Sequence, residues 1–224
     1  MPSEFSSDGS LSNAEQLTKN CSNPYEIIPI NGVYDSYLNA LEPVFKGTKF
    51  NVAEENLQAR ARGMMLMAIS NKKGGILLNT SNKSEMSVGY STLYGDMCGG
   101  LSPIGDLYKM EVYALAKFIN KKHGTLIPEE IINKEPSAEL RPDQKDSDSL
   151  PIYPVLDKIL YQYIEERKSP QEIISSGIEE LVVMDVLSKV NRNEYKRYQA
   201  APVIRVSKKA FGYGRRMPLV GKYF

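Results

Sequence analysis

The sequence predicts an α/β fold in which a parallel sheet carries helices on both faces. Two short apolar segments, YEIIPI (25–30) and ILLN (76–79), are typical of buried strands. Segments with helical periodicity alternate with them through short connections, which is the order that βα units follow. Apolar residues make up 42% of the 224 residues, so the chain can bury a substantial core and does not belong to the disordered class.

Local signals define the predicted elements in the first half of the chain. Ser12 with Glu15, and Asn51 with Glu54, have the spacing of a capping box at the start of a helix. Gly74 and the glycine after it are expected to end the second of these helices. We predict, in order, a helix over about 13–20, a strand at 25–30, helices over 33–45 and about 52–71, and a strand at 76–79.

The second half is predicted to be mostly helical. Ser169 is a suitable cap, and Pro170 follows at the first helical position. The segment 134–151 is polar and rich in proline and acidic residues, and a loop of this length inside a compact domain is usually functional or mobile. The expected helices lie at about 109–121, over 153–166, from 170, and near 179–190.

The segment NTSNKSEMSVGYSTLYGD (79–96) places many polar groups directly after a predicted strand. Ligands of open parallel sheets bind beyond the carboxyl ends of the strands, where Thr80 would lie. Helix N-terminal amides near 82–84 would favour an anion, and Glu85 could hold Mg2+ through its oxygens. Lys109 could reach a phosphate as a point charge. A solvated loop with an exposed helix is the alternative that spacing alone leaves open.

The predicted helix 52–71 offers a second candidate group. Asn56, Arg60 and Met64 are four residues apart and therefore share one helical face. This spacing is compatible with an anion clamp at Arg60, and equally with a surface arginine that packs its stem. Met65 and Met67, with Met64, are expected to pack in the core.

The charge distribution and the apolar segments limit which partners and which cellular location we expect. The net charge is +1, but residues 192–224 hold nine basic residues and one acid, so this basic tail is +8 and the rest of the chain −7. The clustering permits nucleic-acid binding. The longest apolar stretch, MMLMAI (64–69), is too short for a membrane span. The N-terminus has no signal-peptide pattern, and the two cysteines have no metal or redox spacing, so we expect a cytoplasmic protein.

Long motifs resemble those of the NAD synthetase family, particularly the synthetase domain of bacterial glutamine-dependent enzymes. The similar segments are ENLQARARGMMLMAISNKKGGILLNTSNKSEMSVGYSTLYGDMCGGLSPIGDLYKMEVYALAKFIN (55–120), MPSEFSS, PSAELRPDQKDSDSLP (136–151), RNEYKR (192–197) and AFGYGRRMP (210–218). The resemblance implies an ATP-pyrophosphatase fold of the adenine-nucleotide hydrolase-like, Rossmann-like type. Residues 1–168 would form an incomplete α/β domain, and 169–224 its C-terminal helices and basic tail.

The resemblance also implies a reaction, the amidation of deamido-NAD to NAD with ATP as co-substrate. The nicotinate carboxylate would attack the α-phosphorus of ATP to give an adenylate, from which ammonia displaces AMP. Crowding two anionic substrates requires Mg2+ and cationic side chains. In the family the synthetase domains pair, so a homodimer is expected. The basic tail matches the family's C-terminus, which disfavours nucleic acid as a partner.

The family's functional residues carry over to positions in this sequence. The positions that resemble ATP-binding residues are Thr80, Lys109 and Ser137. Those that resemble deamido-NAD-binding residues are Asn56, Arg60, Glu85, Tyr90 and Lys196. Glu85 is also the expected metal ligand, and Asp96 could accept a proton from incoming ammonia. The ammonia-only enzymes have other residues at Leu93, Gly100 and Tyr195, so these three positions favour the glutamine-dependent branch.

One family motif is missing. The phosphate-gripping Ser-Gly-Gly-x-Asp-Ser loop does not occur in the sequence, so the chain is expected to begin after the first strand and helix of the fold. The glutaminase domain that would supply ammonia is also absent. We therefore expect a chain that is weak or inactive alone. The missing N-terminal half or a glutaminase domain, carried on another chain, is a candidate partner. The alternative is a non-catalytic remnant that dimerises or binds dinucleotide.

Overall fold

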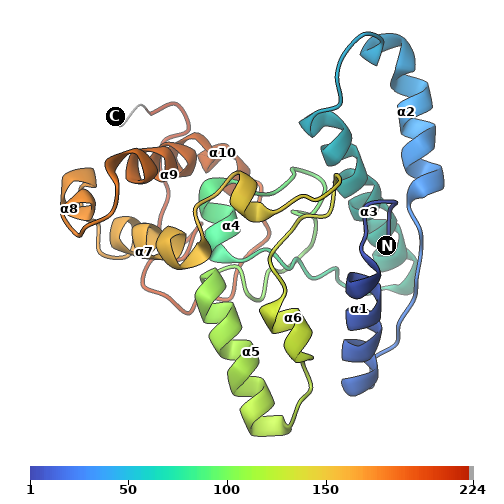
Figure 1. The fold of residues 1–224 in the computed structure, drawn as a ribbon, viewed down its shortest axis with the longest axis horizontal. Coiled ribbons are helices and arrows are strands. Elements are labelled where there is room, and N and C mark those ends of the chain that lie inside the picture. The colour runs from blue at the N-terminus through green and yellow to red at the C-terminus, as the bar shows by residue number, and fades with distance from the viewer. Residues whose placement is uncertain (222–224) are drawn as a thin grey trace.

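The computed structural model describes residues 1–221, and its regular structure is helical (Figure 1). Lys222, the last residue of the predicted basic cluster, lies outside the described residues. A short 3-10 helix, η1 (Asp146–Asp148), lies between α6 and α7. The α-helices are α1 (Asp8–Asn20), α2 (Asn31–Phe45), α3 (Val52–Lys73), α4 (Lys83–Val88), α5 (Lys109–His123), α6 (Glu129–Asn133), α7 (Tyr153–Ile164), α8 (Pro170–Ile174), α9 (Glu180–Arg192) and α10 (Glu194–Arg197).

The capping signals account for where several helices begin. Asn51 accepts a hydrogen bond from the Ala53 amide at 2.8 Å, and Glu54 accepts one from the Asn51 amide at 2.8 Å. This reciprocal pair satisfies amides that have no partner within α3, as the sequence predicted. Ser169 caps α8 in the same way, with Pro170 at the first helical position. The predicted starts of α3 and α8 are therefore confirmed.

Helix α1 begins earlier than predicted. Ser7, not Ser12, is its N-cap and accepts a hydrogen bond from the Ser10 amide at 3.2 Å. Ser12 lies within the helix and donates its hydroxyl to Gly9 O at 3.2 Å. An acidic residue in the first turn, Asp8, favours the earlier start because it complements the helix dipole.

The predicted parallel sheet is not formed among residues 1–221. Leu78 pairs with Leu101, and Ser102 with Val203, each as a single parallel bridge. The predicted strand 76–79 thus takes part in one bridge, and the predicted strand 25–30 is irregular. A strand needs a neighbouring segment whose amides and carbonyls pair with its own along several residues. Here Leu78 with Leu101, and Ser102 with Val203, pair at a single position each.

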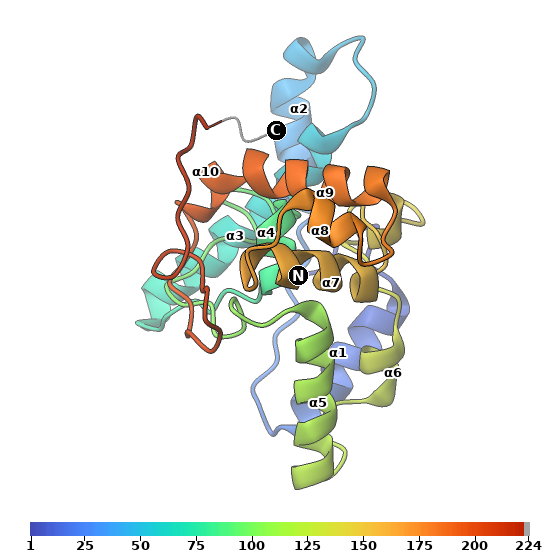
Figure 2. The ribbon, with the colours of Figure 1, turned by 90° about the vertical axis from the view of Figure 1, so that its left-hand side faces the viewer.

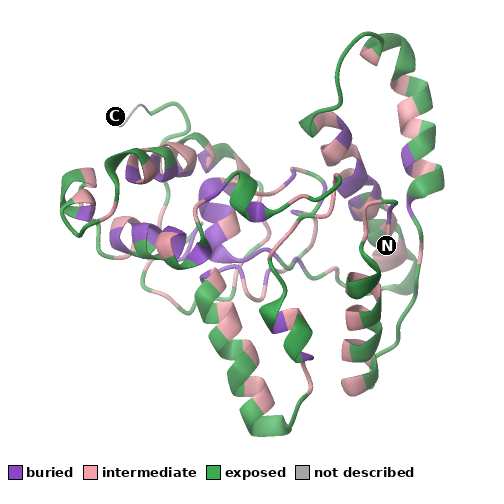
Figure 3. Cartoon of the chain, viewed as in Figure 1, coloured by how far each residue is buried: buried purple, intermediate pink, exposed green. Residues whose placement is uncertain are grey.

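The hydrophobic core lies in the second half of the chain. Figure 3 shows the buried residues concentrated in α4, α7 and α9, whereas α1 and α2 are largely exposed. The fully buried apolar side chains of this core are Leu156, Ile159, Leu160, Ile173, Val183, Val186, Leu187 and Val190. The core cluster includes residues on both sides of position 168, and the division predicted there stays a prediction.

Helices α1 to α3 lie beside this core and contribute little to it (Figures 1 and 2). Helix α1 buries no residue, and α2 buries only Tyr34. The expectation that the α3 methionines pack in the core is wrong for two of them, since Met64 is 66% exposed and Met67 36%. The reason is that no element of the described chain covers the C-terminal half of α3 on that side.

A buried lysine joins α4 to the C-terminal segment. Lys83 has no exposed surface, and its ammonium lies 2.9 Å from Asp106 Oδ1, 2.5 Å from Glu165 Oε1 and 2.7 Å from Ser207 Oγ. Asp106 also accepts the amides of Val206 and Ser207. A buried ammonium persists only when paired and hydrogen-bonded, so this group fixes four chain segments together.

Candidate functional site

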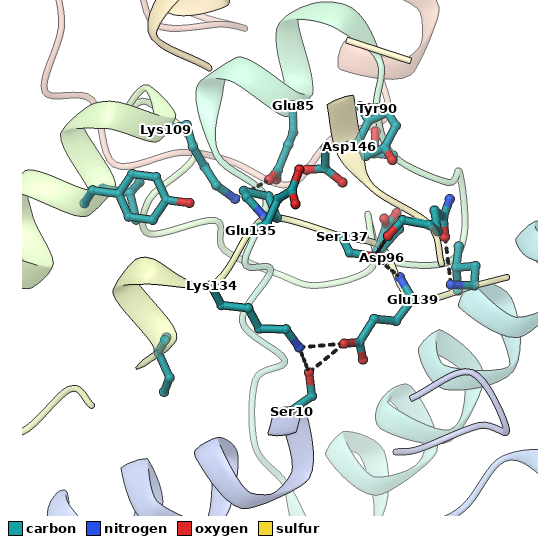
Figure 4. A pocket seen from close by; sticks show the side chains of 18 of the residues that line it. Ser10, Glu85, Tyr90, Asp96, Lys109, Lys134, Glu135, Ser137, Glu139 and Asp146 are labelled. Carbon is teal, nitrogen blue, oxygen red and sulfur yellow. Dashed lines mark hydrogen bonds and ion pairs between the residues drawn. The ribbon is translucent and has the colours of Figure 1, made fainter. Parts of the chain in front are cut away.

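A cavity of about 970 Å3 lies between α1, α3, α4, α5, α10 and the loop that follows α6 (Figure 4). This volume suits a ligand of dinucleotide size. Seven of the nine side chains predicted as functional line it: Asn56, Glu85, Tyr90, Asp96, Lys109, Ser137 and Lys196.

Glu85 and Lys109 form an ion pair at the wall of this cavity (Figure 4). Helix α4 begins at Lys83 because Asn82 and Glu85 form a capping box, with the Glu85 amide donating to Asn82 Oδ1 at 3.0 Å. The second carboxylate oxygen, Oε1, lies 3.2 Å from Lys109 Nζ. Both side chains keep about a fifth of their surface exposed, 20% and 19%, so a ligand can reach them.

The anion-binding amides expected near 82–84 are partly occupied. The Asn82 amide donates to Glu85 Oε2 at 3.2 Å, and the Lys83 amide donates to Leu107 O at 2.8 Å. Positive charge at this wall comes instead from Lys109, whose ammonium lies 5.1 Å from the centre of the Tyr153 ring. An ammonium over an aromatic face is stabilised electrostatically, so the ring helps to hold Lys109 in place.

Asp96 lines the cavity and is exposed to solvent there. It accepts a hydrogen bond from the Thr92 amide at 2.6 Å and is reachable from the cavity. The surrounding protein desolvates its carboxylate and, with help from the negative charge of Glu85, raises its pKa to about 6, although the Thr92 amide and Lys196 oppose the rise. A group with such a pKa can exchange a proton near neutral pH.

Lys196 and its neighbours bind the carbonyls at the end of α4. The Lys196 ammonium donates to Gly89 O and Ser91 O, both at 2.7 Å, and burial lowers its pKa. Asn193 donates to Val88 O at 2.9 Å, and Arg197 donates to Ser87 O at 2.6 Å. The segment RNEYKR therefore satisfies carbonyls that have no partner within α4 and brings Lys196 to the cavity.

Asn56, Ser137 and Tyr90 also line the cavity. Asn56 Oδ1 accepts the Thr92 hydroxyl at 2.6 Å, and the Ser137 hydroxyl donates to Gln144 O at 2.5 Å. Tyr90 is half-buried, and burial raises its pKa, so it stays a neutral phenol. These groups form part of the cavity wall.

Thr80 and Arg60 do not line this cavity. Thr80 lines an adjoining cavity of about 390 Å3 that shares Asp96, Ala138, Glu139 and Leu140 with the larger one. Arg60 lines neither, and its Nε donates to Leu93 O at 3.2 Å. It lies one helical turn beyond Asn56, which carries it about 6 Å along α3.

A polar cluster that sequence reasoning missed joins the loop after α6 to α1 (Figure 4). Lys134 Nζ lies 2.7 Å from Glu139 Oε1 and 2.5 Å from Ser10 Oγ, and the Ser7 hydroxyl also donates to Glu139. Burial opposes the charge of Glu139, but these hydrogen bonds together lower its pKa. The only signal in the sequence was the polar composition of segment 134–151, because the partners lie far apart along the chain.

Among the described residues, none of the helices combines the length and the apolar content that a membrane span needs.

The chain is similar to known proteins over most of its length. A family model described as NAD synthase matches residues 1–200. The glutamine-dependent NAD(+) synthetase of Synechocystis sp. is 50% identical over 219 residues, which are 98% of this chain and 39% of that protein. The protein of the same name from Thermotoga maritima is 49% identical over 224 residues, which are 100% of this chain and 39% of that protein.

A solved structure agrees with these relatives. The glutamine-dependent NAD+ synthetase of Acinetobacter baumannii, in complex with adenosine diphosphate, has 42% sequence identity and a TM-score of 0.60, over 98% of this chain and 39% of that chain. The chain thus spans about two fifths of the length of the curated relatives it matches.

Proposed function

The chain belongs to the NAD synthase family, as its motifs predicted, and from this premise we propose that it forms the substrate-binding part of an enzyme that amidates deamido-NAD to NAD at the expense of ATP. The observation that carries this proposal is the shared cavity of about 970 Å3, which seven of the nine expected side chains line. Two of the seven are ammonium groups, Lys109 and Lys196, as two anionic substrates require.

The proposed reaction has two steps. An oxygen of the nicotinate carboxylate attacks the α-phosphorus of ATP, the bond from that phosphorus to the bridging oxygen breaks, and pyrophosphate leaves. Ammonia then attacks the carbonyl carbon of the adenylate, AMP leaves, and the nitrogen loses a proton. Asp96 is proposed to accept this proton, because its raised pKa of about 6 makes a carboxylate a better base near neutral pH.

We propose that the two substrates meet where the two cavities adjoin. Of the expected ATP-binding side chains, Thr80 lines the smaller cavity, whereas Lys109 and Ser137 line the larger one, so ATP would extend across the junction of the two. The related A. baumannii structure contains an adenine nucleotide, which supports nucleotide binding in general. Tyr90, on the larger cavity, would offer an aromatic face to the pyridine ring. Asp96 lines both cavities, so a proton acceptor stands at the proposed meeting point.

Glu85 fits a magnesium ion held mainly by phosphate oxygens. Mg2+ in nucleotide sites takes one or two carboxylates and completes its coordination with phosphate and water. Within residues 1–221, three or more acidic, histidine or cysteine side chains do not gather as a metal site, so Glu85 would act as a single protein ligand. When bound, the ion would neutralise charge on the triphosphate.

We further propose that NAD synthesis needs a segment that residues 1–224 do not contain. The Ser-Gly-Gly-x-Asp-Ser loop expected of the family is not in this sequence. Its backbone amides would complete the pyrophosphate site, and a strand beside 76–80 would extend the single bridge at Leu78 toward the parallel sheet of the ATP-pyrophosphatase fold. A second copy of the chain and a glutaminase domain are the further proposed partners.

The basic tail supports small anionic ligands over nucleic acid as partners. Its arginines make contacts within the chain: the Arg215 guanidinium lies 5.3 Å from the Tyr163 ring centre, and Arg216 lies 5.8 Å from that of Tyr198. Arg205 donates to Lys208 O at 2.9 Å. Arg205 and Arg216 nevertheless stay exposed and charged, so the preference for small anionic partners rests on the match of the tail to the family's C-terminus.

Calorimetric titration of the purified chain with deamido-NAD, and with ATP and Mg2+, tests the proposal. We expect wild-type binding and a loss of about tenfold or more in Lys109→Ala, because a charge-assisted contact is worth about 1.5–3 kcal/mol. Lys122→Ala, which alters an exposed lysine at the far end of the same helix, is the matched control. A wild-type chain that binds neither substrate contradicts the proposal.

Asp96 is tested by turnover in a preparation that includes the missing phosphate-binding segment. Asp96→Asn should lower ammonia-dependent NAD formation by about 10²-fold, the lower end of what a general base contributes. Full turnover in that variant would remove the assigned role. Robust synthesis by residues 1–224 alone would contradict the need for another segment, and binding without synthesis in the complemented preparation would favour the non-catalytic alternative.

A further inference from the structure

Behind the Glu85–Lys109 ion pair lies a second carboxylate that none of the expected roles includes. Asp157 is on α7 and is 8% exposed, and α7 packs against both α4 and α5. Its Oδ1 accepts the Ser84 hydroxyl at 2.5 Å, and its Oδ2 accepts the Met110 amide at 2.9 Å. Ser84, itself fully buried, accepts the Lys109 amide at 2.9 Å.

These three hydrogen bonds join the residues on either side of the site. Ser84 precedes Glu85 in α4, while Lys109 and Met110 are the first two residues of α5. The amides of Lys109 and Met110 have no partner within α5, and Tyr108 at the N-cap offers no side-chain acceptor bond. Asp157 and Ser84 supply that cap from two other helices, so the start of α5 is fixed relative to α4.

We propose that Asp157 is a positioning residue that acts through Ser84 and the first turn of α5 to set the separation of Glu85 and Lys109. The inference rests on the proposed function in that Glu85 and Lys109 would contact the metal-bound nucleotide. Asp157 itself does not line the cavity, so it does not touch the ligand. Its carboxylate at the helix N-terminus also complements the dipole of α5.

Removing the carboxylate should weaken the hydrogen bonds that fix the start of α5 relative to α4. In Asp157→Asn, one oxygen becomes an NH2 group that cannot accept, so the Met110 amide or the Ser84 hydroxyl loses its partner. Ser84→Ala is the second variant, because it removes the hydroxyl that bridges Asp157 and the Lys109 amide while leaving Asp157 in place. Each variant should increase the motion of Lys109 relative to Glu85.

The matched control lies on the same helix. Gln162 is 6% exposed, and it bonds to Lys158 O and Ser176 Oγ, away from α4 and α5. Gln162→Ala therefore removes a buried polar side chain of α7 and leaves the hydrogen bonds among Asp157, Ser84 and the first turn of α5 in place. It reports what a general loss of α7 packing does to the site.

The first measurement needs no ligand. Acylation of Lys109 by an amine-reactive ester is followed by mass spectrometry, with Lys122 as the internal reference. We expect labelling of Lys109 to rise about threefold or more in Asp157→Asn and Ser84→Ala, because local opening exposes the amine. The same ratio should be unchanged in Gln162→Ala. Unchanged labelling of Lys109 in both Asp157→Asn and Ser84→Ala overturns the proposal, whether or not the chain binds nucleotide.

The second measurement is a double-mutant cycle on ATP affinity. Asp157→Asn should weaken ATP binding about tenfold in the wild-type background and have no further effect in Lys109→Ala, because both changes act through one group. Equal losses in the two backgrounds contradict a role through Lys109. A wild-type chain that binds no ATP refutes the proposed function but leaves the labelling result to decide the positioning role.

Discussion

Residues 1–80 and residues 81–211 both contain helices that begin with a capping box but bury very different amounts of apolar surface. The core cluster runs from Met86 to Phe211, and in the first 80 residues only Ile30, Tyr34, Ala59 and Ala61 are buried apolar side chains. Helix α3 nevertheless has a complete capping box and a left-handed glycine, Gly74, at its end. Local capping thus fixes where a helix forms, and it does not decide whether that helix is covered.

The difference implies an uneven distribution of stability. Regions with few buried apolar contacts open locally at a lower free energy than the global unfolding of a domain. The candidate site lies at the boundary, with Asn56 contributed by α3 and the Glu85–Lys109 pair by the packed half. Paired substitutions in the two halves test whether stability is distributed in this way.

The largest effect is expected at the buried lysine. Lys83→Met should lower the free energy of unfolding by about 3–5 kcal/mol, because Asp106 and Glu165 would keep buried charges without a partner. Lys19→Ala is the counterpart in the first half. Its ion pair with Glu15 has side chains 65% and 51% exposed, so the loss should be below about 1 kcal/mol. Urea unfolding measures both, and equal losses would break the comparison.

Two leucines test the same contrast without charge. Leu160→Ala should cost about 2–5 kcal/mol, since this side chain is fully buried and its loss leaves a cavity. Leu66→Ala on α3, where the leucine is 38% exposed, should cost less than about 1 kcal/mol because less apolar area is lost. Thermal and urea unfolding should rank the two variants in this order. The reverse order would mean that α3 is covered in solution.

Two glycines with the same backbone angle separate strain from packing. Gly74 and Gly89 both have φ of +70°, but a Cβ on Gly74 meets nothing within 4 Å, whereas one on Gly89 would lie 2.1 Å from Asn193 Cγ. Gly74→Ala should cost about 1–2 kcal/mol from the left-handed backbone alone. Gly89→Ala should cost about 1–3 kcal/mol more through overpacking. Similar unfolding free energies for the two variants would show that the α4–Asn193 contact is loose.

The smallest effect concerns the pH dependence of stability, because Asp96 is exposed and solvent screens its charge. The pKa of Asp96 is raised from 3.8 to about 6, so the folded chain binds more protons than the unfolded chain between these values. The stability from this group is therefore present below its unfolded pKa and lost as the pH rises through about 6. Asp96→Asn should flatten the fall in unfolding free energy measured across that window. Parallel curves for the two proteins would contradict the raised pKa.

Much of the candidate site could be predicted because its motifs are continuous in sequence. Glu85 and Lys109, with most of the residues expected to accompany them, reach one cavity, and the capping boxes of α3 and α8 form as their spacing indicates. Arg60 and Thr80 lie outside that cavity. Their spacing identified the correct elements but could not fix the direction in which each side chain points.

Local sequence was enough to place the starts of α3 and α8 and to identify the family, because caps act over three or four residues and long motifs identify relatives without any geometry. Only the tertiary structure decided that Asp157 lies behind the Glu85–Lys109 pair, that Met64 is exposed, and that the segment 76–79 pairs through one bridge. The difference arises from how far along the chain each interaction reaches. A capping hydrogen bond is made within one turn, whereas burial and strand pairing depend on what distant segments place alongside.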